Sequence, residues 1–160
     1  MRNACFLIAC ITALAAPAGT VRADPLPEGA RPLAARSLVK LYSGTTLDRE
    51  TSMAYFAPDL TVKGVSGKNL KGAVWVGTWQ AKGNEVCMDV QWRDLATGKT
   101  GPSRDCWKWY VAPDKTIWTL WSVHYDGTRP DPDGDYYDGE LAKMKRGDLV
   151  SDRYARLTGQ

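Results

Sequence analysis

Two stretches of alternating residues, each containing one cysteine, constrain the fold of this chain more than any other feature. In "EVCMDVQWR", residues 85–93, every second side chain is apolar, which is the period of a strand with one buried face. "RDCWKWYVA", residues 104–112, repeats the pattern. Cys87 and Cys106 both fall on the more polar face. The sequence therefore predicts two strands whose cysteines lie on the same side of a sheet.

A disulfide between Cys87 and Cys106 fixes how these strands pair. With the cysteines opposite each other in an antiparallel pair, position 89 faces 104 and position 91 faces 102. We predict the bond because two cysteines are left in the expected mature protein, and an even pair in an exported protein is normally oxidised. It would join neighbouring strands on the side away from the apolar layer.

The chain opens with the layout of a secretory signal peptide, "MRNACFLIACITALAAPAGTVRADP". A basic residue precedes an apolar run that is too short to span a bilayer, and small residues ending in "VRA" follow. We predict cleavage after Ala23, with Ala18 as the second choice. A lipid anchor at Cys10 is disfavoured because the apolar run continues beyond that cysteine.

Cleavage after Ala23 leaves 137 of the 160 residues, which is the usual size of one domain. We expect an extended arm over residues 24–32 and a single β-rich domain over 33–160. The expected mature chain is nearly neutral, which gives no indication of nucleic acid or an anionic membrane as a partner. No later segment has the length and apolarity of a membrane span. The expected location is outside the cytoplasm, in the periplasm if the source is a Gram-negative bacterium.

The domain is expected to be mainly β: a small antiparallel barrel or strongly curved sheet with one short N-terminal helix and one disulfide. The helix is predicted over residues 33–42, where apolar residues share one broad face before Ser43-Gly44. From Thr45 onward, short segments rich in β-branched and aromatic residues alternate with turn signals. The last segment, residues 140–157, is predicted as a hairpin around 146–148, with a short helix as the alternative.

Seven tryptophans fall on the predicted strands between residues 75 and 121. Large rings can fill a barrel core, or they can form a stacking surface for a sugar or another flat ligand. Core packing is the expected role for most of them. The aromatic residues that we consider as ligand-binding candidates, together with the only histidine, are Trp79, Trp107, Trp109, Trp118, Tyr110 and His124.

Motifs for catalysis are absent from the sequence, which contains no G-x-S-x-G, no H-E-x-x-H and no glycine-rich phosphate loop. A single histidine, His124, argues against a site built from several imidazoles. A hydrolase that uses His124 and aspartates stays an alternative, but no catalytic residue is assigned. The sequence leaves open whether the protein is an enzyme and favours a non-catalytic role.

An acidic segment, "DGTRPDPDGDYYDGE", spans residues 126–140 and resembles a calcium-binding loop at first sight. An EF-hand starting at Asp131 would require glycine at its sixth position and glutamate at its twelfth, where Tyr136 and Ala142 stand. No cofactor is therefore expected. A looser Ca²⁺ site is the alternative, and its ligands would be Asp131, Asp133, Asp135 and Asp138. A surface loop stiffened by proline is the favoured interpretation.

The segments "LVKLYSGTT", "AYFAPDLTVKG", "GTWQAKGNEVCMDVQW" and "CWKWY" together resemble an uncharacterised family of exported proteobacterial proteins, domain-of-unknown-function family 995. The chain departs from the family pattern at Leu47 and at Asp59-Leu60. "GTW", residues 77–79, is also similar to the G-x-W signature of lipocalin-like barrels. The family resemblance implies an exported, β-rich domain with a disulfide, and it implies no reaction.

The leading hypothesis is a non-catalytic exported protein that binds a small apolar or sugar-like ligand or supports the cell envelope. The alternative from another class is a protein-binding module, such as an inhibitor of an envelope hydrolase. Small disulfide-bonded β-domains present loops rigidly, and the segments 94–103 and 126–139 would then form the contact surface.

Overall fold

The computed structural model of this protein describes residues 24–131 and 133–160. The expected signal peptide, residues 1–23, lies outside the described residues, as do both predicted cleavage sites and the disfavoured lipid anchor at Cys10. The described chain forms one antiparallel sheet of ten strands with two α-helices. The prediction of a mainly β fold with a strongly curved sheet and one disulfide is confirmed.

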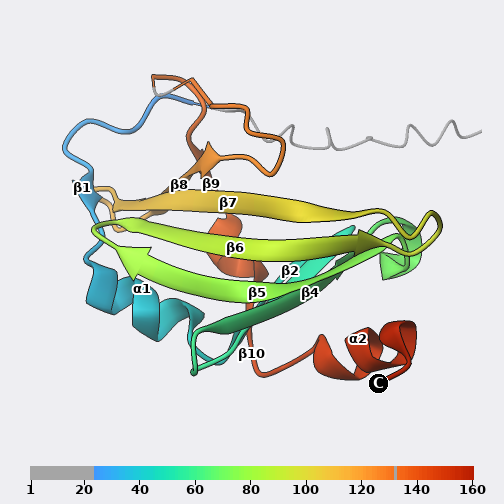
Figure 1. Ribbon diagram of the computed structural model, residues 1–160. Coiled ribbons are helices and arrows are strands. Elements are labelled where there is room, and N and C mark those ends of the chain that lie inside the picture. Colours follow the sequence, from blue (N-terminus) through green and yellow to red (C-terminus); the bar gives the residue numbers. More distant parts are fainter. Residues whose placement is uncertain (1–23, 132) are drawn as a thin grey trace, which may run out of the picture.

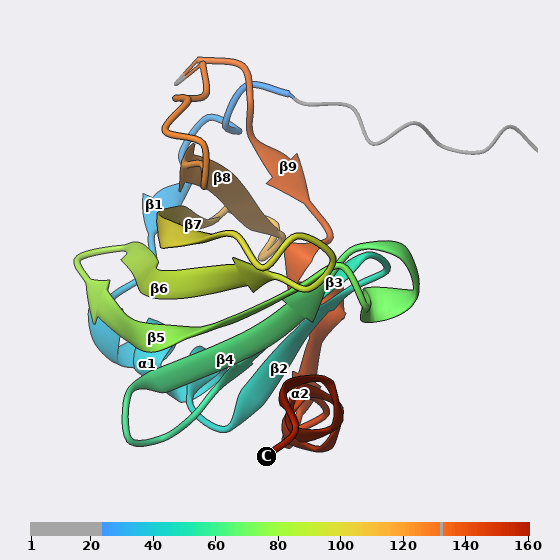
Figure 2. The same cartoon turned by 45° about the vertical axis from the view of Figure 1, so that its right-hand side comes forward.

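The sheet follows the order β10-β2-β3-β4-β5-β6-β7-β8-β9, and β1 pairs with β7. It curls into a half-barrel with a concave and a convex side (Figures 1 and 2). The strands are β1 (Arg31–Pro32), β2 (Thr45–Arg49), β3 (Ser52–Phe56), β4 (Thr61–Ser66), β5 (Ala73–Lys82), β6 (Glu85–Asp94), β7 (Thr100–Val111), β8 (Ile117–Val123), β9 (Tyr137–Asp138) and β10 (Met144–Arg146). A short 3₁₀ helix, η2 (Glu140–Lys143), connects the last two strands, so the chain itself bridges the two ends of the sheet order.

Strands β6 and β7 pair as the alternation predicts. Cys87 is opposite Cys106, Asp89 is opposite Arg104, and Gln91 is opposite Pro102. The two cysteines form the disulfide with their Cα atoms 4.1 Å apart, close to the spacing of the nearer pairs in an antiparallel ladder.

Helix α1 (Ala35–Tyr42) closes one end of the half-barrel, and it confirms the predicted N-terminal helix. Its fully buried Leu38 and Tyr42 belong to the main core cluster. The Tyr42 ring packs edge-on against Phe56 at 4.7 Å and against Trp109 at 5.8 Å between ring centroids. Trp79 completes this aromatic plug, and its indole Nε1 donates to the carbonyl oxygen of Ala57 at 3.0 Å.

Helix α2 (Ser151–Thr158) covers part of the convex side, toward the opposite end of the strands from α1 (Figure 1). The hairpin predicted for residues 140–157 is wrong. Residues 144–146 form β10 against β2, and a helix follows, as the alternative had it. The helix packs Tyr154 and Leu157 against a second core cluster that contains Val65 and Val74. That cluster gives the last segment an apolar surface to cover. The residues of the segment alone do not reveal this surface, so their pattern did not favour the helix.

The N-terminal segment 24–32 is joined to the sheet at both of its ends. The backbone N–H of Asp24 donates to the oxygen of Tyr136 at 2.8 Å, and the reverse bond measures 3.1 Å. Its last two residues form β1 against Tyr110 and Val111. No helix in the described part of the chain has the length and apolarity to cross a membrane.

Candidate functional site

The concave side of the half-barrel holds a cavity of about 870 Å³. The aromatic plug beneath α1 fills the closed end. Four tryptophans line it, Trp75, Trp92, Trp107 and Trp121, together with Met88 and Val90. The polar residues that line it are Arg49, Thr51, Ser52, Ser66, Ser103, Asp105 and Asp126, and Gly67, Ala73, Pro102 and Tyr125 complete the lining.

Two of these indoles lie over glycines on neighbouring strands. Trp75 is opposite Gly64 of β4, and a Cβ placed on Gly64 would come within 2.2 Å of the indole. Trp92 is opposite Gly101 of β7, where an added Cβ would lie 3.1 Å from the ring. The missing glycine side chains let both rings lie close to the backbone. This arrangement keeps space in the cavity that upright indoles would fill.

The other two indoles of the lining, Trp107 and Trp121, form the wall toward β8. Trp107 and Trp121 stack with centroids 6.1 Å apart and planes inclined by 19°. The guanidinium of Arg49 lies over both rings, with Cζ at 5.2 Å from Trp107 and 5.4 Å from Trp121. Such cation–π contacts are stronger when the cation is shielded from water. Here the Arg49 side chain keeps 23% of its surface exposed.

A buried carboxylate fixes Arg49. Glu140 is 1% exposed and accepts hydrogen bonds from Nε of Arg49 at 3.0 Å and from its Nη2. Lys143 donates to the other oxygen of Glu140 at 3.0 Å. Burial works to lower the pKa of Arg49, but the adjacent Glu140 carboxylate outweighs it and the pKa is raised. The guanidinium therefore stays charged, and it is held where β2 meets η2.

Asp105 carries the acidic group of the same wall. It is 5% exposed, and its Oδ1 accepts a hydrogen bond from Trp121 Nε1 at 3.0 Å. Burial raises the pKa of Asp105, while the Trp121 hydrogen bond and the charge of Arg49 oppose the rise. The wall thus presents an indole pair, one cation and one shielded carboxyl group to the cavity.

The structure separates the residues considered for ligand binding. Trp107 lines the cavity. Trp79 and Trp109 are buried in the plug at the closed end. His124 lies beside the wall, with its ring stacked on Trp121 at 4.2 Å.

The other two candidates, Trp118 and Tyr110, alternate with buried residues of β8 and β7 and lie on the opposite face. Tyr110 packs edge-on against Tyr136, with 5.5 Å between centroids. The barrel wall is therefore the packing partner of Tyr136.

Sequence reasoning missed Arg49, Asp105, Trp75, Trp92 and Trp121 as a group. The alternation of residues 85–93 places Trp92 on the apolar face of its strand, and this was the signal in the sequence for a residue that lines the cavity. Arg49 carried no signal, because its partner Glu140 is 91 positions away in the sequence.

The acidic loop directs its carboxylates toward its own backbone. Oδ1 of Asp131 accepts from the N–H of Asp133 at 2.9 Å, and Oδ2 of Asp135 accepts from the N–H of Asp131 at 2.6 Å. Asp138 lies in β9, opposite Trp118. The four aspartates considered for Ca²⁺ do not form a cluster of three within ligand distance in the described ranges.

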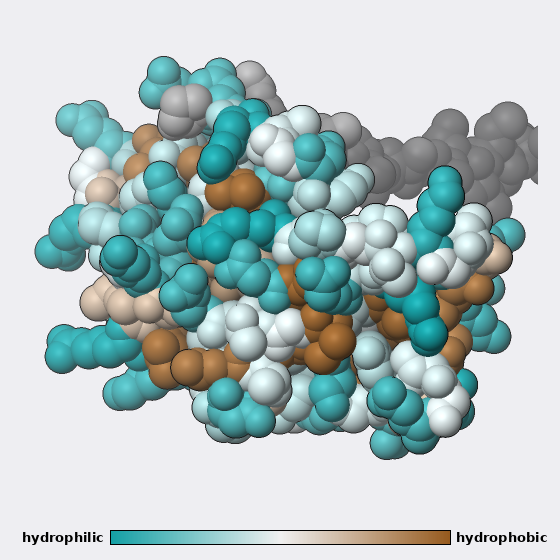
Figure 3. Space-filling model, viewed as in Figure 1, coloured by the Kyte–Doolittle hydropathy of each residue, from teal (hydrophilic) through white to brown (hydrophobic). Residues whose placement is uncertain are grey.

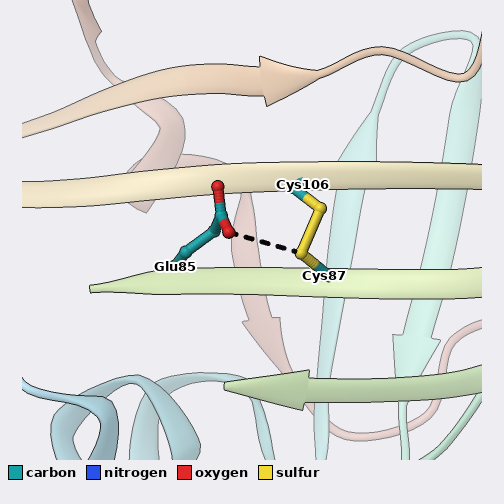
Figure 4. A group of neighbouring side chains, drawn as sticks. All are labelled: Glu85, Cys87 and Cys106. Atoms are coloured by element: carbon teal, nitrogen blue, oxygen red, sulfur yellow. Dashed lines mark hydrogen bonds between the residues drawn. A yellow bond between two sulfur atoms is a disulfide. The ribbon is translucent and has the colours of Figure 1, made fainter. Parts of the chain in front are cut away.

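One cluster of potential metal ligands does occur in the described chain, formed by Glu85, Cys87 and Cys106 (Figure 4). Glu85 Oε2 lies 3.7 Å from Cys87 Sγ, and Glu85 Oε1 accepts a hydrogen bond from Ser122 at 2.6 Å. Both sulfurs are used in the disulfide, and metal-binding cysteines are thiolates. In its oxidised form this cluster is therefore a structural feature of the convex side.

A family model described as "Protein of unknown function (DUF995)" matches residues 8–152. This match covers most of the chain and confirms the resemblance to that family. No curated protein matches the chain, and no solved structure does.

Proposed function

Since the chain belongs to the DUF995 family of proteins of unknown function, we propose a function from the cavity itself: the protein binds a small, flat, largely apolar molecule inside the half-barrel. The proposed role is binding rather than catalysis. The proposed place of action is outside the cytoplasm, as the signal-like N-terminus and the disulfide favour.

The single observation that carries the proposal is the tryptophan lining. Ligand sites in proteins are concave, mainly apolar pockets of about 300–1,000 Å³ with a few polar groups. The cavity of about 870 Å³, lined by four indoles, falls in that class. Indoles offer broad flat faces, so planar molecules gain the most from stacking against them.

A filling substitution tests this proposal. Ser103 lines the cavity from β7, whereas its neighbour Arg104 forms an exposed ion pair with Asp89 on the opposite face. We expect Ser103→Phe to weaken binding of the uncharged, planar fluorescent probe pyrene at least about tenfold, because the ring occupies the binding volume. Arg104→Phe places the same ring on the convex side and should leave binding unchanged.

Cooperative thermal unfolding of each variant shows that it is folded. Equal probe affinity in the parent protein and a folded Ser103→Phe variant would contradict the proposal. If Ser103→Phe does not fold, Ser66→Leu fills the cavity from β4 and tests the same point. Native mass spectrometry of the protein purified from its producing cells should show a bound small molecule, and Ser103→Phe should reduce that species.

A further inference from the structure

Arg49 gives the cavity a chemical preference beyond flatness. It is the only cationic side chain among the described residues that line the cavity. Its Nε and Nη2 donate to Glu140, and the hydroxyl of Tyr137 also lies beside the guanidinium. A guanidinium has five N–H donors, so donors remain after both partners are served. These remaining donors are available to an acceptor atom on a bound molecule.

The position of Arg49 over the indole pair disfavours a ligand cation. The guanidinium itself lies over the rings of Trp107 and Trp121, where a ligand cation would otherwise gain most from the indoles.

The charges around Arg49 disfavour a ligand anion. The positive charge of Arg49 is already matched by the buried Glu140 carboxylate. Asp105 adds a further acidic group to the wall. A ligand carboxylate would therefore enter a space whose one lining cation is neutralised, and it would lose its hydration without a free counter-charge.

We infer that the ligand is uncharged and that an oxygen of the carbonyl type, as in an aromatic ketone, quinone or lactone, accepts a hydrogen bond from Arg49. This inference rests on the proposed binding function. The hydroxyls of Ser52, Ser66 and Ser103 line the cavity elsewhere and accommodate further polar substituents on the same ring system. Arg49 acts as the specificity-determining residue of the site.

Four probes that share one naphthalene ring test the inference by equilibrium dialysis: the methyl ketone, the ethyl hydrocarbon, the carboxylate and the aminomethyl cation. We expect the ketone to bind about tenfold more tightly than the hydrocarbon, the gain of one charge-assisted hydrogen bond. Both charged probes should bind more weakly than the ketone.

The double variant Arg49→Met/Glu140→Gln removes both charges together and leaves no buried carboxylate unpaired. The ketone and the hydrocarbon should bind it with equal affinity, whereas Arg104→Met, which removes an exposed arginine on the opposite face, should keep the tenfold preference. Arg49→Lys retains the charge without the forked geometry and should retain part of the preference.

Two results would overturn the inference while binding itself persists. One is tightest binding by the carboxylate or by the cation, and the other is a ketone preference that survives in the double variant. Failure of all four probes to bind is a different result, because it contradicts the proposed function. If the double variant does not fold, a ketone that binds the parent protein no more tightly than the hydrocarbon does overturns the inference.

Discussion

The indole of Trp75 lies directly across Gly64, its partner on the neighbouring strand, so closely that a single added methyl group would come within 2.2 Å of the ring. Glycine is normally unfavourable within a strand because it loses more conformational freedom and packs nothing. At Gly64 the absence of a side chain instead leaves room for the indole of Trp75. The size of the cavity thus depends on a pair in which one residue is as small as possible and the other as large.

Gly64→Ala should therefore destabilise the protein by about 1–3 kcal/mol, the usual cost of overpacking a core. It should also push Trp75 into the cavity and weaken probe binding. Urea denaturation and a probe titration measure the two effects. Gly134→Ala is the control, because an added Cβ there meets its nearest neighbour at 3.4 Å in the exposed loop. A Gly64→Ala variant as stable as the parent would contradict the packing argument.

Loss of the disulfide should cost about 3 kcal/mol, the loop-closure entropy for a bridge of this span. The cysteines are 19 positions apart. The β6–β7 ladder continues for six residue pairs beyond the cysteines in one direction and for two in the other, so the fold should survive reduction. We expect Cys87→Ala/Cys106→Ala to unfold cooperatively at lower urea concentration than the parent. Dithiothreitol should shift the parent toward the variant and leave the variant unaffected. Equal stability of parent and variant without dithiothreitol would show that the bridge is dispensable.

Arg49→Met alone should destabilise the protein more than Arg49→Met/Glu140→Gln. The single change leaves the buried Glu140 with Lys143 as its remaining ionic partner, and breaking a buried pair on one side costs about 3 kcal/mol. The double change removes the unpaired charge and should recover most of that loss. Thermal denaturation of the four combinations forms a double-mutant cycle. Additive effects of the two substitutions would show that the pair is not coupled.

Asp105 should make stability depend on pH. Burial raises the pKa of Asp105, so the folded state holds its proton more tightly than the unfolded state does, with Arg49 and His124 as the charges that oppose the shift. Its stabilising contribution is present below the unfolded-state pKa of about 3.9 and is lost as pH rises through the folded-state value. Asp105→Asn should therefore be more stable than the parent at neutral pH, with the difference shrinking toward acidic pH.

Asp114→Asn provides the opposite case, since hydrogen bonds from Thr116 lower the pKa of that exposed carboxylate. It should lose stability at neutral pH relative to the parent and approach it at acidic pH. Unfolding midpoints collected across a pH series measure both differences. The same sign in the two variants would refute the assignment of the Asp105 shift to burial.

Export should release a chain that begins at Asp24. The backbone of Asp24 is paired with Tyr136, so a chain that starts at this residue keeps its N-terminus against the wall of the sheet. Intact mass and N-terminal sequencing of the protein recovered from the extracytoplasmic fraction identify the first residue. A chain that starts after Ala18, or one that retains the whole leader, would contradict the predicted cleavage site.

Exposed apolar residues on the convex side do not by themselves indicate a binding site. Val76 of β5 is 46% exposed, and hydrophobic residues appear on this face as separate patches among hydrophilic ones (Figure 3). Isolated apolar residues are common on protein surfaces and need no partner. The concave side differs because its apolar residues converge on one volume.

The sequence by itself determined the local features: the strand alternation, the helix before Thr45, and the cysteine register that places Asp89 opposite Arg104. Each follows from the period of side chains along a strand or helix, which neighbouring residues fix. Only the tertiary structure decided the fate of each tryptophan. Trp79 and Trp75 lie on the same face of the same strand, yet α1 covers Trp79 whereas Trp75 borders open space.

The contact between Arg49 and Glu140 and the position of α2 were likewise decided only by the tertiary structure. Arg49 meets Glu140 because β10 pairs with β2 and places η2, which precedes β10, beside the end of β2. Helix α2 forms where it covers the cluster on the convex side. Contacts between residues so far apart along the chain depend on curvature and closure of the whole sheet. Local periodicity contains no information about that curvature, so the cavity and its single cation emerge only in the folded molecule.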